Sequence, residues 1–288
     1  MKTWLTLLLF SAVIGAQATS SINASNRYAY GANFGWIDTR PDTTNGAVIG
    51  EFVCSGYLYS ANCGWINLGS GNPANTNQYQ NNSGTDFGVN RDSAGNLRGY
   101  AYGANIGWIN FETNGAAKVD LRTGVLSGYA YSANCGWISL SNASAYVQTD
   151  TIAAGADSDG DGIPDAWEIQ HAGNLTTLTH NGDADNDGVT DYQEYLADTD
   201  PLSAASSLRI TAKSFTKVTG TEDDFITWTS QPTRNYDLQY STTLFPGSWN
   251  SVGSQFNSTN TTITGEFTSR SPAIYRFFRV QALRPLAP

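Results

Sequence analysis

Two acidic segments of the chain have the residue types and spacing that hold a metal ion. Each is a 12-residue loop with oxygen ligands at positions 1, 3, 5, 9 and 12 and a glycine at position 6, where the chain turns sharply. The backbone carbonyl at position 7 adds a further ligand. The first loop offers Asp157, Asp159, Asp161, Ile163, Asp165 and Glu168. The second offers Asp183, Asp185, Asp187, Val189, Asp191 and Glu194.

This donor set favours calcium. Ca²⁺ takes about 6–8 oxygen ligands, whereas Mg²⁺ requires a smaller octahedral site and keeps its waters. We therefore predict two calcium sites, closed by Glu168 and Glu194, each binding through both oxygens from the first turn of a short helix. A trivalent lanthanide would also bind in vitro. The alternative, a solvated acidic linker, does not explain why the spacing and the glycine recur together.

The loops resemble thrombospondin type 3 repeats, calcium-binding relatives of EF-hand loops, over residues 155–201. The run Asp-Gly-Ile-Pro-Asp at 161–165 carries this likeness. EF-hands place a large apolar residue at position 8, where this chain has Pro164, which lacks an N–H, and Thr190. Met1 is the only methionine, which excludes the Met-rich groove of an EF-hand sensor. The resemblance implies structural ions that space and stiffen extracellular domains.

The negative charge of the chain is concentrated around these loops. The formal charge is -10, from 25 acidic and 15 basic residues, and 13 of the acids lie between residues 149 and 204, where there is no Lys or Arg. The remainder, with 12 acids and 15 bases, carries +3. Because the whole chain is acidic, it has no basic surface for a phosphate backbone, and we expect no nucleic-acid partner.

The sequence does not predict an enzyme. Outside the loops the acids are scattered, and in the N-terminal part Asp38, Asp86, Asp120 and Glu51 form no evident catalytic pair. The two histidines, at positions 171 and 180, lie between the metal loops rather than beside a nucleophile. We interpret both as surface or inter-loop packing residues.

The first residues resemble a secretory signal. Lys2 supplies a positive charge, residues 4–15 an apolar stretch, and Ala16-Gln-Ala18 a small-residue cleavage site. The alternative is a short buried helix. We predict a signal peptide at 1–18, a secreted or cell-surface mature protein, and no transmembrane segment, because no later run reaches about 18 apolar residues.

Residues 19–148 contain four copies of one pattern, Tyr-x-Tyr-x-Ala-Asn-x-Gly-Trp-Ile. The copies occupy 28–37, 57–66, 100–109 and 129–138. Alternating residues before and after an Asn-x-Gly turn predict a β-hairpin in each copy, and the uneven spacing favours an antiparallel meander over a solenoid. The recurring asparagines are interpreted as turn residues.

The aromatic residues of the copies allow two interpretations. The favoured one buries each Trp and one Tyr in the core, because large rings stabilise a fold when buried. The alternative is an exposed aromatic face on which sugar rings stack. The cysteines at 54, 63 and 135 leave at least one thiol unpaired, and either a bridge between Cys63 and Cys135 or simple burial fits their positions.

Residues 205–288 contain about seven short β-rich segments and predict a sandwich. Trp228, the Tyr236–Tyr240 segment and the late Tyr275-Arg-Phe-Phe-Arg-Val run resemble a fibronectin type III domain. That resemblance makes Tyr275 a candidate for the tyrosine corner.

The whole chain thus predicts a mainly β protein with a signal peptide, a hairpin domain (19–148), a calcium module (149–204) and a sandwich (205–288). The predicted function is a secreted or cell-surface calcium-binding structural or adhesion protein whose calcium loops rigidify the link between β domains. The alternatives are a carbohydrate-binding protein that uses the aromatic repeats and a subunit of an extracellular filament or surface layer. The partner is an unidentified extracellular protein or polysaccharide, and self-association is possible.

Overall fold

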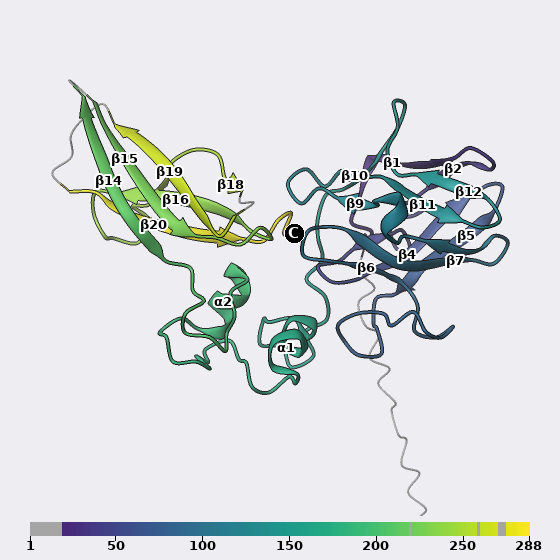
Figure 1. The fold of residues 1–288 in the computed structure, drawn as a ribbon, viewed down its shortest axis with the longest axis horizontal. Helices are drawn as coiled ribbons and strands as arrows, with labels where there is room; N and C mark the ends of the chain where they lie inside the picture. The colour runs from purple at the N-terminus through teal and green to yellow at the C-terminus, as the bar shows by residue number, and fades with distance from the viewer. Residues whose placement is uncertain (1–18, 219–220, 258–259, 270–274) are drawn as a thin grey trace, which may run out of the picture.

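The computed structural model describes residues 19–218, 221–257, 260–269 and 275–288, and the predicted signal peptide lies outside them. The fold is mainly β, as predicted. Two β domains lie at the ends of the long axis, and two short helices lie to one side between them (Figure 1). Among the described residues, no helix has the length and apolar character needed to cross a membrane.

The N-terminal domain is a closed ring of the four repeated hairpins. The hairpins are β1 (Ile22–Gly31) with β2 (Gly35–Asp38), β4 (Cys54–Ser60) with β5 (Gly64–Ser70), β7 (Leu97–Gly103) with β8 (Gly107–Asn110), and β11 (Tyr129–Ser132) with β12 (Gly136–Ser139). Each hairpin pairs antiparallel with the next, and β12 pairs back onto β1, where Tyr30 lies opposite Ser139. The meander therefore closes into a barrel, which leaves the ring without an open edge.

Shorter elements complete the barrel domain. They are β3 (Val48–Ile49), β6 (Val89–Arg91), the 3-10 turn η1 (Thr113–Gly115), β9 (Lys118–Val119), β10 (Leu126–Ser127) and β13 (Val147–Thr149). Strands β3, β6 and β13 pair with β4, β7 and β1 respectively, and β9 pairs with β10.

The prediction that the repeats bury their tryptophans is wrong. The four Trp side chains, at 36, 65, 108 and 137, are 46–50% exposed. The barrel interior is filled instead by the residue between the two tyrosines, which is alanine in three copies and Leu58 in the second, and by the isoleucine after the tryptophan, as with Ala29 and Ile37. Because side chains alternate along a strand, placing alanine and isoleucine inside puts tyrosine and tryptophan outside. Small inward residues also suit the narrow interior of a small barrel.

The repeated asparagines join neighbouring hairpins. In the first contact, the Asn62 Nδ2 donates to the Phe34 carbonyl at 2.7 Å. The same bond recurs from Asn105 to Cys63, Asn134 to Ile106 and Asn33 to Cys135, at 3.2, 3.1 and 3.0 Å. The asparagines thus form a cyclic set of contacts between copies, in addition to their place in the turns. All three cysteines are free thiols.

The C-terminal domain has two antiparallel sheets. One contains β14 (Ile210–Val218), β15 (Thr221–Thr229) and β19 (Thr262–Ser269), and the other β16 (Asn235–Ser241), β17 (Asn250–Ser251), β18 (Phe256–Asn257) and β20 (Phe277–Leu283). Buried Trp228 packs on Phe256 across the sheets, with ring centroids 5.3 Å apart. The tyrosine-corner prediction for Tyr275 is wrong, because its side chain is 70% exposed. Tyr236 is buried instead, and its hydroxyl accepts from the Gln231 N–H.

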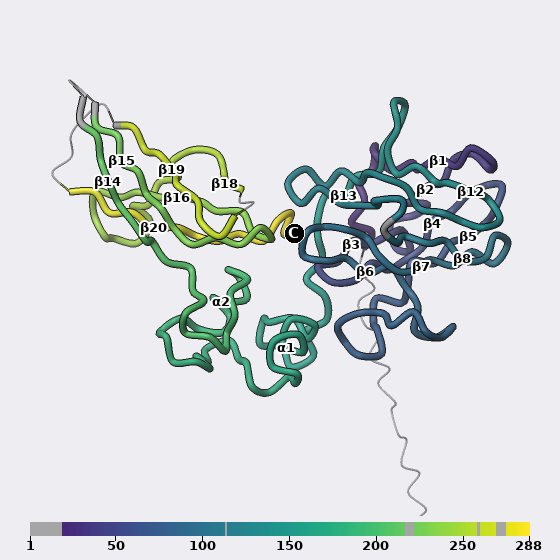
Figure 2. Tube along the Cα trace, viewed as in Figure 1, coloured from purple at the N-terminus to yellow at the C-terminus, as the bar shows by residue number. Residues whose placement is uncertain are grey.

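The helices between the domains are α1 (Asp165–Ala172) and α2 (Asp191–Ala197). The chain runs from the barrel through α1 and α2 into the sandwich, and its last residues return to the barrel (Figure 2). Leu286 packs against the barrel core, and its carbonyl accepts from the Ile152 N–H at 2.8 Å.

Candidate metal centre

The two predicted metal loops share two internal hydrogen bonds. In the first, Asp157 at position 1 accepts from the Gly162 N–H at 3.0 Å, and Asp161 at position 5 accepts from the Ile163 N–H at 2.8 Å. In the second, the equivalent bonds join Asp183 to Gly188 at 2.9 Å and Asp187 to Val189 at 2.8 Å. The glycines at position 6 have φ of 95° and 93°, a conformation that L side chains rarely adopt.

The carboxylates at positions 1, 3 and 5 lie close together in both loops. In each loop one oxygen from each of the three aspartates lies within 4.8 Å of the others. The triads are Asp157, Asp159 and Asp161 in the first loop and Asp183, Asp185 and Asp187 in the second. Each loop therefore brings together a set of hard oxygen donors able to hold an ion.

The glutamates at position 12 add carboxylates that lack protein partners. Glu168 and Glu194 are completely buried, and both oxygens of Glu168 and one of Glu194 have no hydrogen-bond partner. Burial, reinforced by the nearby aspartates, raises the pKa of Glu168 to about 7 and that of Glu194 to about 8. A buried carboxylate without a donor is costly, and a cation supplies the missing interaction. The donor set therefore fits a divalent ion in each loop.

The aspartates predicted as ligands at position 9 accept hydrogen bonds from position 2 of their own loops. Asp165 accepts from the Ser158 N–H at 2.7 Å, and Asp191 accepts from the Ala184 N–H at 3.0 Å. Both side chains are buried. They brace position 2 of each loop against the start of the following helix. The second oxygen of Asp165 accepts from the Ser158 hydroxyl, and that of Asp191 accepts from the Thr179 N–H at 2.9 Å. Sequence spacing alone does not separate a ligand from such a brace.

Local sequence signals place the closing glutamates. Helix α1 begins after Pro164, whose fixed φ suits a helix start, and ends at Gly173 in the left-handed conformation. Helix α2 begins with a capping box, in which the Thr190 hydroxyl accepts from the Gln193 N–H and the Gln193 side chain accepts in return. Each glutamate thus stands in the first turn of a short helix, as the sequence predicts.

The loops pack together around a small core of Ile163, Trp167, Leu178 and Tyr195. Each histidine packs on an aromatic ring, His171 on Trp167 and His180 on Tyr192, with centroids 4.3 Å apart in both pairs. The His180 Nδ1 also lies 2.8 Å from the Asp161 carbonyl. These contacts place the histidines between the loops.

This paired arrangement can be compared with known protein families. Residues 157–173 and 183–204 match the bacterial TSP3 repeat. TSP3 repeats are a calcium-binding, extracellular type of repeat, so the resemblance read from the two loops is confirmed. Neither curated proteins nor solved structures give a match to this chain, and the fibronectin type III resemblance of the last domain stays a prediction.

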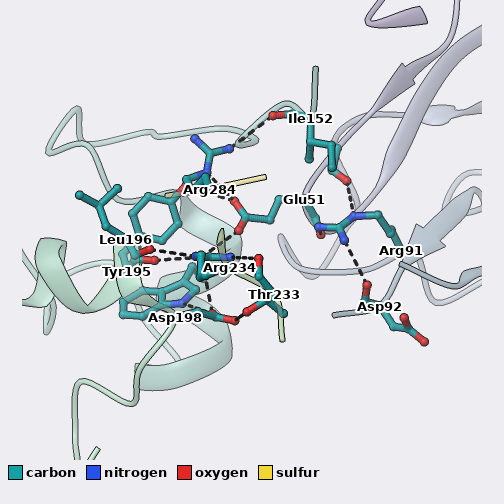
Figure 3. Close-up of polar contacts among 12 residues, drawn as sticks. Glu51, Arg91, Asp92, Ile152, Tyr195, Leu196, Asp198, Thr233, Arg234 and Arg284 are labelled. Carbon is teal, nitrogen blue, oxygen red and sulfur yellow. Dashed lines mark hydrogen bonds and ion pairs between the residues drawn. The ribbon is translucent and has the colours of Figure 1, made fainter. Parts of the chain in front are cut away.

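The segment that matches the TSP3 repeat, residues 157–204, is here called the TSP3 segment. It meets both β domains at a buried ionic junction around Glu51 (Figure 3). Glu51, from the barrel domain, is 9% exposed. Its carboxylate lies 3.0 Å from Arg234 Nη2 and 3.2 Å from Arg284 Nε, both from the C-terminal domain. It also accepts from the Tyr195 hydroxyl of the TSP3 segment at 3.1 Å. One carboxylate therefore contacts all three parts of the protein.

Arg234 extends the junction into α2. Its guanidinium donates from Nε to the Leu196 carbonyl and from Nη2 to the Tyr195 carbonyl, both at 2.9 Å. Both carbonyls lie at the C-terminal end of a short helix, where carbonyls need partners from outside the helix, and that of Tyr195 also accepts from the capping Asp198 N–H at 3.2 Å. Asp198 follows the helix, 3.7 Å from Arg234, and accepts from the Trp167 Nε1 of α1 at 3.4 Å.

The barrel side of the junction is held by a second buried arginine. Arg91 donates from Nε to the Gly50 carbonyl at 2.9 Å and from Nη2 to the Glu51 carbonyl at 2.5 Å. The sequence shows Glu51 only as one of several scattered acids. The arginines that contact Glu51 lie between 40 and more than 200 positions away in the sequence. No local pattern indicates such a pairing.

Proposed function

We propose that this chain is a secreted calcium-binding structural or adhesion protein, in which two calcium ions hold the barrel and the sandwich in a fixed relation. The junction around Glu51 carries this proposal. A buried charge with partners from three parts of the chain holds its geometry only if all three stay in place, since loss of one partner leaves an uncompensated buried charge. The ions in this account are structural.

The proposed ion in the second loop lies close in the sequence to the junction. Glu194 closes the second loop from the first turn of α2, and the next two residues, Tyr195 and Leu196, supply the carbonyls that bind Arg234. Calcium held by Glu194 therefore fixes the helix that presents those carbonyls. The first loop contributes through Trp167, whose ring lies 5.6 Å from that of Tyr195.

A non-catalytic role is part of the proposal. The scattered acids of the barrel domain each have a structural use. Asp38 pairs with Arg27 at 3.4 Å, and Asp120 accepts from the N–H groups of Arg122 and Thr123. Asp86 is buried and accepts from two backbone N–H groups, and Glu51 belongs to the junction.

Carbohydrate binding by the barrel is a second candidate function, because the repeat tryptophans are exposed. Each Trp lies between the two tyrosines of its own hairpin, as Trp36 does with Tyr28 at 6.3 Å and Tyr30 at 4.9 Å. Rings held in this way are rigid and half open to solvent, which suits stacking against a sugar ring.

Calorimetry of the whole chain tests the calcium role. With a Kd of about 10⁻⁵ M per site, about 1 mM calcium stabilises the folded state by roughly 2.7 kcal/mol per site. We expect a higher melting temperature in calcium than in EDTA, and no difference for the double variant Asp157→Ala plus Asp183→Ala. An unchanged melting temperature for the wild-type protein would refute the proposal.

The junction is tested separately with Glu51→Gln, and Asp38→Asn serves as a control at a barrel ion pair outside the junction. We expect Glu51→Gln to retain two bound calcium ions by titration calorimetry but to unfold in two separate transitions. Asp38→Asn should unfold as the wild type does. A single calcium-responsive transition in Glu51→Gln would show that the junction does not couple the domains.

A further inference from the structure

We propose that a groove beside Trp108 on the barrel binds a neutral sugar ring. The groove has a volume of about 440 Å³, within the range of small-molecule sites. The 71–88 loop forms one wall, and the third repeat forms the other. This inference rests on the carbohydrate-binding candidate above and assigns it to one of the four repeats.

The loop wall is anchored to the barrel. Tyr79 is 3% exposed, and its hydroxyl accepts from the Gly71 N–H at 2.5 Å and donates to the Cys54 carbonyl at 3.2 Å. The Asn90 side chain binds the Tyr79 backbone at both its N–H and its carbonyl. These contacts fix the loop before a ligand arrives, which lowers the entropic cost of binding.

The aromatic wall differs from that of the other repeats. Phe87 from the loop lies edge-on to Trp108, with centroids 5.1 Å apart, and also contacts Tyr102 at 6.2 Å. Among the described residues, the aromatic ring contacts of the other three repeat tryptophans are all with the tyrosines of their own hairpins. Trp108 is nevertheless 46% exposed, so a ring remains available for stacking at the groove.

The polar lining points to a neutral saccharide. Besides Phe87, Tyr100 and Trp108, the groove is lined by Asn81, Asn82 and Ser83, and no charged residue contributes. The Asn81 amide is used within the loop, where it accepts from the Gly88 N–H at 3.0 Å. The exposed Asn82 amide has no partner among the described residues and is free to bind sugar hydroxyls. An uncharged groove with an aromatic ring and side-chain amides matches a pyranose, whose C–H groups stack on aromatic rings and whose hydroxyls bind amides.

The fourth repeat provides a contrast. The groove beside Trp137 is about 170 Å³, below the usual size of a ligand site, and includes the carboxylate of Glu112. A sugar-sized, uncharged groove beside a repeat tryptophan is thus formed where the 71–88 loop meets the third copy.

The test measures binding of neutral oligosaccharides to the calcium-loaded full chain by titration calorimetry. The probes are hexasaccharides of β-1,4-glucan, β-1,3-glucan, β-1,4-mannan, β-1,4-xylan and chitin. Trp108→Ala is compared with Trp36→Ala, which removes a ring of nearly the same exposure, 48%, at the same place in another repeat. We expect Trp108→Ala to weaken binding at least tenfold and Trp36→Ala to change it less than about twofold.

Gly84→Phe is a second variant that does not remove a ring from the fold. A Cβ at Gly84, which lines the groove, meets no atom within 4 Å, so the larger side chain enters open space at the groove and should block it. No binding of any probe by the wild type would overturn both the groove and carbohydrate binding. Equal effects of the two Trp variants, or unimpaired binding by Gly84→Phe, would overturn the groove while carbohydrate binding by another ring remained.

Discussion

Glu168 and Glu194 should make the proposed calcium sites sensitive to pH, because their pKa values are raised to about 7 and about 8. Without calcium, the folded state keeps these carboxyls protonated up to that range, whereas the unfolded chain releases the protons near pH 4.5. The folded state therefore binds more protons between these values, and the free energy of unfolding falls as the pH rises through the window.

We predict that the calcium-free protein melts at a lower temperature at pH 8 than at pH 5.5, as measured by calorimetry in EDTA. Calcium binding must displace the protons, so the apparent affinity should also rise between pH 6 and pH 8. Calcium affinity independent of pH over this interval would contradict the placement of these two carboxyls.

Replacement of one closing glutamate separates the cost of burying its carboxyl without calcium from its contribution to calcium binding. In Glu194→Gln the carboxyl that folding must either protonate or bury as a charge is absent, so we expect a higher melting temperature than the wild type in EDTA at pH 8. The same variant should bind one calcium ion in place of two and melt below the wild type in calcium. Glu168→Gln is the matched control in the other loop. Two bound ions in either variant would show that the glutamate at position 12 is not a ligand.

At the scale of the elements, substitutions in one repeat hairpin can show which face of the strand stabilises the barrel. Ile37 is 1% exposed and Trp36 is 48% exposed, although they are neighbours in the sequence. We predict that Ile37→Ala lowers the free energy of unfolding by about 2–5 kcal/mol and Trp36→Ala by about 1 kcal/mol. Urea unfolding measures both. A larger loss for Trp36→Ala would restore the interpretation of the tryptophans as core.

The same elements show where sequence reasoning succeeds. The metal loops, the helix starts and the hairpins depend on nearby residues, such as the Gly162 turn or the Thr190 cap, and local patterns predict them. The inward face of the repeat strands is ambiguous, because alternation predicts two faces without saying which one is buried. The large size of the tryptophan ring favoured the prediction that it is buried. Burial of Trp36 would, however, require more space than the interior of a small barrel provides.

Closure of the barrel and formation of the junction lie beyond local patterns. Pairing of β12 with β1 joins residues more than 100 positions apart, and the sequence shows only that the copies repeat. Glu51, Arg234 and Arg284 come together because three parts of the chain fold against one another. The brace role of Asp165 likewise depends on the position of one backbone N–H.

At the scale of the whole molecule, the proposed calcium role depends on a chain of contacts. The end of α2 binds Arg234 of the sandwich, and Tyr195 binds Glu51 of the barrel, so we propose that calcium in the second loop acts on both domains by fixing α2. The return of Leu286 to the barrel closes the same arrangement from the C-terminal side. The barrel exterior, with its exposed rings, stays free of this junction and is available for a ligand.

Small-angle X-ray scattering of the full chain, in calcium and in EDTA, tests the central claim most directly. The account predicts that the profile in calcium matches one arrangement of the two β domains, and that EDTA increases the radius of gyration as the junction loosens. Glu51→Gln should scatter in calcium as the wild type does in EDTA. Identical profiles for the wild-type protein with and without calcium would contradict the claim that the ions hold the domains together.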